Sequence, residues 1–176
     1  RQPQISQPTT TVETAHQDDP DDPASASVKR TFAVHHASQA TFSTDLASND
    51  LDLYVLYDAN NDGNFTTNEI VGSSAGATGV ESVRLIGPLD GNYQVWVQGF
   101  SVAGTPTFNL RSSIIQGNDL TVTGLPAGAI PAGTAVTIHV AYSKAMTAGQ
   151  TYLGELLLGP PTAPRALSVP ITIGRT

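Results

Sequence analysis

One twelve-residue stretch, from Asp58 to Glu69, has the residue types and the spacing to bind a metal ion. Its sequence, DANNDGNFTTNE, fits the calcium-loop pattern D-x-[DN]-x-[DN]-G-x5-E at every specified position. Calcium prefers oxygen ligands, and this pattern supplies carboxylates, amides and a backbone carbonyl around a sharp turn at Gly63. We expect calcium ligands at Asp58, Asn60 and Asp62, at the carbonyl of Asn64, at Thr66 directly or through water, and bidentately at Glu69.

An alternative is that the stretch is a metal-free turn, because Asn, Asp and Gly also favour tight turns. That alternative accounts for the composition of the loop but not for a Glu at its twelfth position. Three carboxylates within twelve residues would also repel one another unless a cation lay among them. If Glu69 alone proves essential for calcium binding, Asp50 or Asp52 of the preceding segment becomes the next candidate ligand.

The segments on either side of the loop exclude an EF-hand. Before it, Leu51-Asp-Leu-Tyr-Val-Leu-Tyr57 is rich in β-formers and too short for the helix of a helix-loop-helix unit. After it, Gly72-Ser-Ser-Ala-Gly76 breaks any helical pattern. We therefore expect a calcium loop that joins two strands and braces a β-domain instead of switching it.

The composition of the whole chain predicts an all-β protein. Its 176 residues are 39% hydrophobic and 13% charged and include 16 Gly and 12 Pro, with turn residues between short β-like segments. The net charge of -7 argues against nucleic acid and anionic membranes as partners. The most apolar stretch, Leu153 to Gly159, has the length of a strand and not of a membrane span. The absence of cysteine does not exclude export, because a chain of this size can bury enough core without disulfides.

We expect two small β-sandwich-like units in tandem, preceded by an extended acidic linker. Residues 1–27 have no periodic apolar pattern and carry five acidic residues, so they predict a flexible acidic linker. Residues 28–114, which contain the calcium loop, and residues 115–176 each show strand-like segments separated by Gly and Pro. An Arg at position 1 leads us to expect a mature or excised piece of a longer protein.

Two sets of motifs resemble known bacterial modules. Phe42-Ser-Thr-Asp-Leu46, Asp50-Leu-Asp-Leu-Tyr-Val-Leu56 and Gly91-Asn-Tyr-Gln-Val-Trp-Val-Gln-Gly99 are similar to the bacterial pre-peptidase C-terminal domain. Asp119 to Thr123, Ala132 to Ile138, Ala148 to Leu156 and Val169 to Ile171 resemble the immunoglobulin-like or fibronectin type III-like unit that ends many secreted subtilisin-like proteases. The matches cover residues 28 to 176. The twelve-residue loop is longer than expected in that family, so its function rests on its own chemistry.

The resemblance implies an accessory region of a secreted, extracellular subtilisin-like serine protease, with roles in secretion, stability or attachment to a protein or glycan substrate. Its first partner would be the upstream catalytic domain of the same polypeptide.

The chain itself offers no catalytic machinery. No segment resembles the His or Ser motifs of a subtilisin-like triad. Gly72-Ser-Ser-Ala-Gly76 matches G-x-S-x-G, but a nucleophile elbow requires a strand-turn-helix context, which is not expected here. Strand alternation makes His139 an exposed residue and not a ligand. We expect a non-enzymatic segment.

One surface could carry a second kind of binding. Alternation along Gly91 to Gly99 places Gln94, Trp96 and Gln98 on one face of a strand, opposite its apolar face. If that face is exposed, it could bind a peptide or glycan by stacking and hydrogen bonding. The alternative is that the second unit or a loop covers Trp96, because large aromatic side chains are seldom left bare.

These observations lead to two functional hypotheses. The first is a non-catalytic, calcium-stabilised accessory segment of a secreted subtilisin-like serine protease. The alternative is a calcium-dependent extracellular adhesion or surface-matrix binding module unrelated to proteolysis. A dockerin-like module is disfavoured, because it would need two loop-helix copies and the chain has one loop.

Overall fold

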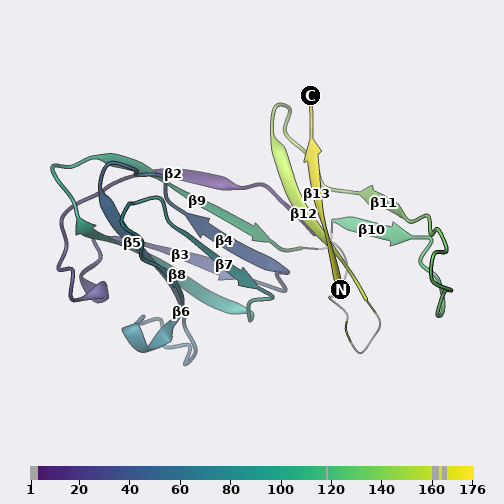
Figure 1. Cartoon of the computed structure of the whole chain (residues 1–176), viewed down its shortest axis with the longest axis horizontal. Coiled ribbons are helices and arrows are strands. Elements are labelled where there is room, and N and C mark those ends of the chain that lie inside the picture. The colour runs from purple at the N-terminus through teal and green to yellow at the C-terminus, as the bar shows by residue number, and fades with distance from the viewer. Residues whose placement is uncertain (1–3, 118, 160–162, 164–165) are drawn as a thin grey trace. The chain divides into compact units, whose positions relative to one another are not determined.

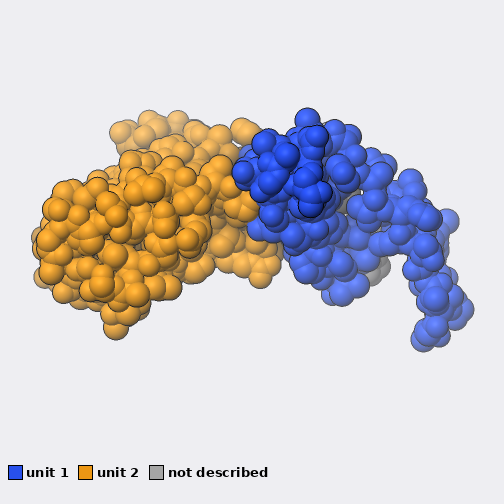
Figure 2. All heavy atoms as spheres, turned by 90° about the horizontal axis from the view of Figure 1, so that it is seen from above, with its two compact units in different colours: residues 1–7, 115–176 blue, residues 8–114 orange. Residues whose placement is uncertain are grey.

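The computed structural model describes residues 4–117, 119–159, 163 and 166–176. It confirms the all-β prediction, with strands throughout and two short 3-10 turns (Figure 1). In the described part of the chain, no helix has the length and apolar character needed to cross a membrane. The chain divides into a large unit, residues 8–114, and a small unit made of residues 1–7 and 115–176 (Figure 2).

The large unit contains two four-stranded sheets. The first has the order β2-β9-β4-β7, with strands Thr9–Thr14, Thr107–Ile115, Gln39–Ser43 and Ser82–Ile86. The second has the order β3-β8-β5-β6, with strands Val28–Val34, Gly91–Ser101, Asp50–Tyr57 and Ile70–Ser74. The two 3-10 turns, η1 (Pro23–Ser25) and η2 (Thr67–Glu69), lie between strands.

The core of the large unit follows from the two-residue period of its strands. Leu51, Leu53 and Val55 of β5 are buried in one cluster with Phe42 of β4 and Phe108 of β9. Side chains from both sheets therefore form one apolar core, as in a β-sandwich.

The small unit is built on two sheets of its own. One has the order β1-β12-β13, with strands Gln4–Ser6, Thr151–Leu158 and Leu167–Gly174; the other pairs β10 (Leu120–Thr123) with β11 (His139–Tyr142). Among the described residues its core cluster is small: Ile5, Leu120, Met146 and Tyr152 are buried, and Ile171 and Ile173 pack against them. Pro170 lies in β13, at the edge of its sheet, as expected for a residue that cannot donate to a central ladder.

For residues 4–27 the prediction of a flexible acidic linker is wrong, and residues 1–3 lie outside the described part of the chain. Strand β1 pairs with β12 of the small unit, and β2 pairs with β9 of the large unit along its whole length. The side chain of Glu13 is buried and forms an ion pair with Arg30. Backbone pairing, this ion pair and a few scattered buried side chains such as Ile5 and Ala15 hold the segment, so it shows no apolar period.

Asp45 links β9 to the loop that follows β4. Its carboxylate accepts hydrogen bonds from the backbone N and Nδ2 of Asn109 and from Nη2 of Arg111, each at 2.8 Å. The Asn109 hydrogen bonds, with a smaller contribution from Arg111, lower the pKa of Asp45 from its usual value of 3.8. A carboxyl whose pKa is lower in the folded state stabilises the fold above its unfolded pKa and loses that contribution as the pH falls through its folded pKa.

We therefore expect Asp45→Asn to lower the free energy of unfolding at pH 6 by about 1–2 kcal/mol, because hydrogen bonds to a charged acceptor are lost. The deficit should shrink as the pH falls below 3.8 and Asp45 itself becomes protonated. Urea unfolding at pH 6 and pH 3 measures both values. Asp52→Asn is the control, and its effect on the free energy of unfolding at pH 6 should have the opposite sign. Burial raises the pKa of Asp52, so its ionised form costs stability at that pH. A deficit of equal size at both pH values would contradict the prediction.

Candidate calcium site

The predicted calcium loop joins two neighbouring strands of one sheet. Strand β5 ends at Tyr57 and β6 begins at Ile70, and the two strands pair antiparallel (Figure 1). The backbone N of Asp58 donates to the carbonyl of Asn92, at 3.0 Å, which fixes the start of the loop. The expected strand-loop-strand arrangement is therefore present, and neither flank is a helix.

Backbone amides of the loop converge on the side chains at its first, third and fifth positions. The two oxygens of Asp58, which is only 1% exposed, accept from the amides of Asp62 and Gly63 at 3.1 Å. Oδ1 of Asn60 also accepts from the Asp62 amide, and Oδ1 of Asp62 accepts from the Asn64 amide at 2.7 Å. These bonds hold four of the six predicted ligand residues in one compact turn.

The turn itself requires unusual backbone geometry. Gly63 has a φ of +77° and Asn61 a φ of +56°, both in the left-handed region that Gly and Asn adopt most readily. A Cβ at Gly63 would meet no atom within 4 Å, so conformation and not space selects glycine there. The position where the motif demands a sharp turn is thus the position where the chain makes one.

Glu69 lies at the end of η2, and one of its carboxylate oxygens has no partner among the described residues. Its Oε2 accepts from the backbone N of Thr66 at 2.9 Å and from the Thr66 hydroxyl at 3.3 Å. Its Oε1 is buried and has no hydrogen-bond partner within the part of the chain that the structure describes. A buried, unsatisfied carboxylate oxygen is costly, and a cation would satisfy it.

The six predicted ligands form two groups in the structure. Hydrogen bonds join Asp58, Asn60, Asp62 and Asn64 in one group, and Thr66 with Glu69 in the other. Among the described residues, no three His, Cys, Asp or Glu side chains converge in a preformed metal cage. The Glu69 carboxylate caps the start of η2 by accepting from Thr66. Calcium coordination would therefore have to draw the two groups together.

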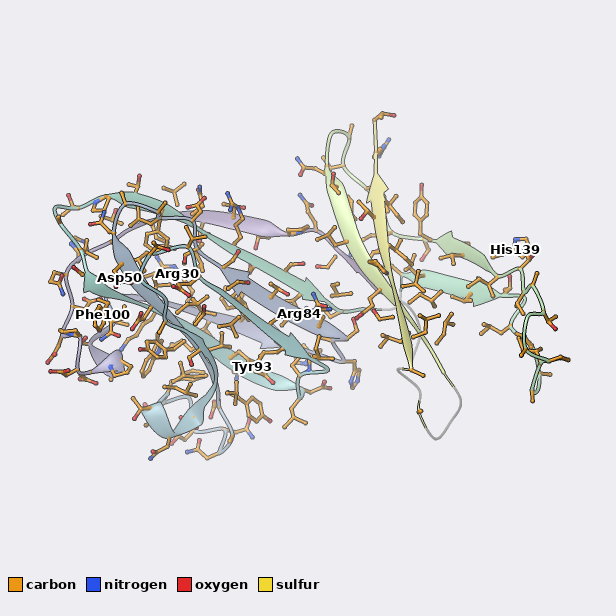
Figure 3. The ribbon with its side chains drawn as sticks, in the orientation of Figure 1. Arg30, Asp50, Arg84, Tyr93, Phe100 and His139 are labelled. Atoms are coloured by element: carbon orange, nitrogen blue, oxygen red, sulfur yellow. The ribbon has the colours of Figure 1, made fainter. Side chains whose placement is uncertain are left out.

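Asp50 and Asp52 do not belong to this loop. They lie at the start of β5, whereas the loop follows its last residue (Figure 3 labels Asp50). At about 3.3 Å per residue, Asp50 is about 26 Å and Asp52 about 20 Å along the strand from Asp58. The hypothesis that either one completes the same metal shell is therefore wrong.

Asp52 has a different environment, close to a tyrosine. Its Oδ2 accepts from the Tyr54 hydroxyl at 3.1 Å, and Asp50 Oδ1 nearby is buried without a hydrogen-bond partner among the described residues. Burial raises the pKa of Asp52, and the Asp50 and Glu81 carboxylates add to the shift. Burial, together with the Asp52 charge, raises the pKa of Tyr54 to about 12.

Two of the three residues of the predicted binding surface, Trp96 and Gln98, are buried, and Gln94 is partly buried. Alternation does place the three on one face of β8, but Trp96 is 1% exposed and Gln98 0%. Residues 15–27, here called the acidic strap, provide part of the cover: Gln98 Nε2 donates to the carbonyls of Asp19 and Asp22. Gln94 is engaged as well, since its Oε1 accepts from the Trp96 indole at 2.5 Å. The alternative of a covered Trp96 holds, and part of the cover comes from a segment expected to be a linker.

Two residues that the sequence did not single out connect the loop to this covered face. Phe65 and Ile70 pack against a buried cluster formed by Ala26, Leu56 and Trp96. Lys29 places its Nζ 4.3 Å from the centre of the Trp96 ring. A lone aromatic residue inside an otherwise polar loop, Phe65, was the sequence signal for this contact.

The G-x-S-x-G match lacks the strand-turn-helix context of a nucleophile elbow. The hydroxyl of Ser74, in the G-x-S-x-G match, is hydrogen-bonded to the Glu81 carboxylate, and the next element is strand β7 instead of a helix. His139 is exposed on β11 (Figure 3), but all four residues of that strand are exposed, so its exposure does not come from the predicted alternation.

Neither a scan against protein-family models nor a search of curated proteins found a match. Among solved structures, the chain is similar to the crystal structure of Aeromonas hydrophila PliG, a periplasmic lysozyme inhibitor of g-type lysozyme. The two are 15% identical, with a TM-score of 0.44, over 61% of this chain and 86% of that chain. A likeness this distant says nothing about function.

Proposed function

We propose that this chain is a non-catalytic accessory segment of a secreted subtilisin-like serine protease, stabilised by one calcium ion in the loop between β5 and β6. The observation that carries the calcium site is the buried Glu69 Oε1 without a partner among the described residues, at the twelfth position of a fully matched motif. The amide network around Asp58 supports it, because it shapes the first half of the loop without metal.

The ligands would be Asp58, Asn60, Asp62, the Asn64 carbonyl, Thr66 directly or through water, and Glu69. The positive charge of calcium would allow these carboxylates to lie close together. Calcium is also coordinated by mixed sets of carboxylate, amide, carbonyl and water oxygens such as this loop offers. Because the loop joins two paired strands, bound calcium would tie the end of β5 to the start of β6. Its role is to brace the large unit.

The test is the thermal stability of the full chain in calcium and in chelator. Binding to the folded state alone stabilises by about 2.7 kcal/mol at a hundredfold excess over Kd, which corresponds to a rise in Tm of about 10 °C for a unit of this size. Asp62→Ala should lose that rise. The matched control Asp21→Ala removes an exposed carboxylate outside the loop and should keep it. Magnesium at equal concentration controls for ionic strength.

Two results would reject the calcium site: equal melting temperatures of the native chain in calcium and chelator, or a full calcium-dependent rise in Asp62→Ala. The link to a protease has its own test, because it rests on the resemblance of residues 28–176. Sequencing the gene upstream of the codon for Arg1 should reveal a subtilisin-like catalytic domain in the same reading frame. An upstream region that encodes an unrelated module would contradict that link.

A further inference from the structure

The cluster around Trp96 joins three separate segments of the large unit. Ala26 comes from the acidic strap, Leu56 and Trp96 come from β5 and β8, and Phe65 and Ile70 come from the calcium loop and its exit. Trp96 is the only tryptophan of the chain. The calcium loop and the strap therefore pack against the same buried ring system.

The two loop residues in this cluster are tied to predicted ligands by the chain itself. Phe65 lies between Asn64 and Thr66, and Ile70 directly follows Glu69. Any movement that draws Glu69 and Thr66 toward Asp58 and Asp62 must therefore change the positions of Phe65 and Ile70 as well. Calcium coordination would consequently fix the apolar cover on one side of Trp96.

The strap is held largely by hydrogen bonds that water can replace. The Asp18 carboxylate accepts from the backbone N of Gly99 at 2.8 Å and of Ser27 at 3.1 Å. Gln17 accepts from the backbone N of Val102 at 2.8 Å, and Lys29, stacked on Trp96, donates to the carbonyl of Ala24 at 2.8 Å. Such bonds are stronger where an apolar layer excludes water. The Trp96 cluster is that layer at the C-terminal end of the strap, where Ala26 belongs to the cluster and Lys29 lies over the ring.

We propose that calcium in the loop locks the acidic strap onto the outer face of the sheet, through Phe65, Ile70 and Trp96. The proposal rests on the proposed calcium site and adds its consequence: calcium sets the stability of strap docking. Without calcium, the loop frees Phe65, the Trp96 cluster loses cover, and the strap opens before the sandwich core unfolds. Local opening of this kind is expected for segments with few buried apolar contacts.

Hydrogen exchange of the full chain tests the proposal, with Trp96 emission as a second readout. Chelator should speed the exchange of strap amides about tenfold while the amides of β4 and β9 stay protected. Trp96 emission should shift to longer wavelength. Phe65→Ala keeps every ligand side chain, so it should still bind calcium in titration calorimetry, but its strap should exchange fast with or without calcium. Phe65→Leu retains an apolar side chain and should restore calcium-dependent protection.

The outcomes separate the two proposals. A native chain that shows no calcium binding by calorimetry overturns the calcium site and this inference together. Binding with unchanged strap exchange overturns the inference alone and leaves the calcium site standing. Full calcium-dependent protection in Phe65→Ala also overturns the inference, because it would show that the lock does not pass through the ring. Faster exchange in β4 and β9 on chelation would contradict it too, since it would indicate global unfolding.

Discussion

Replacing Ile5 by alanine will unfold the small unit while the large unit, residues 8–114, stays folded. Ile5 is fully buried, and it belongs to the core cluster of the small unit, which has four buried members among the described residues. Removing a buried isoleucine side chain costs about 2–5 kcal/mol, and a core this small supplies about 3–5 kcal/mol in total. The substitution therefore removes most of the unit's stability from a position that sequence analysis assigned to a linker.

Hydrogen exchange resolved by peptide measures this result. Amides of β10 and β12 should lose protection in Ile5→Ala, whereas those of β5 and β8 should keep it. Ile5→Val is the matched control and should cost about 0.5–1.5 kcal/mol, leaving the small unit folded. Unchanged protection of β12 in the alanine variant would show that β1 is dispensable.

Gly99→Ala will dislodge the acidic strap from the sheet. A Cβ at this position would lie 1.8 Å from the carbonyl oxygen of His16 and 3.0 Å from Val102, so backbone must move. The same glycine exchanges hydrogen bonds with Asp18, through its own carbonyl and amide. We expect a loss of about 3 kcal/mol, at the upper end of the overpacking range, and emission of Trp96 at longer wavelength as its cover leaves.

Urea unfolding and tryptophan fluorescence measure the two effects. Gly128→Ala is the control, since a Cβ there meets no atom within 4 Å and its φ is not in the left-handed region. A Gly99→Ala protein with native stability and native Trp96 emission would refute the docking of the strap.

Strong local patterns predicted the fold class and the candidate loop. The alternation of β8 predicted its inward residues Tyr93, Val95 and Val97, and the twelve-residue motif predicted a turn at Gly63, where φ is positive. Strands β1 and β2 were missed because each carries one buried side chain among its described residues, too few to show a period. Their partners, β12 and β9, lie far along the chain, and no local signal encodes such pairing.

The errors at the candidate site have different origins. The cover on the Trp96 face of β8 depends on long-range contacts from a segment whose composition is typical of a linker: Asp19 and Asp22 accept from Gln98, and Ala26 packs in the Trp96 cluster. The exclusion of Asp50 and Asp52 required only the length of β5, and strand geometry could have supplied it from the sequence. One oxygen of Glu69 accepts from Thr66, and the other is buried without a partner among the described residues. This arrangement depends on the orientation of the side chain, which no motif specifies.

The position of β1 has a mechanical consequence. Strands β1 and β13 both run antiparallel to β12 and flank it, so they point in the same direction. Tension between Gln4 and Gly174 would pull them in opposite senses along their axes, loading the backbone hydrogen bonds in shear instead of peeling them one by one. In the sequence, the large unit is inserted between Ser6, the last residue of β1, and strand β12. As long as β1 stays paired, the force bypasses the large unit, and the calcium loop and strap bear no load.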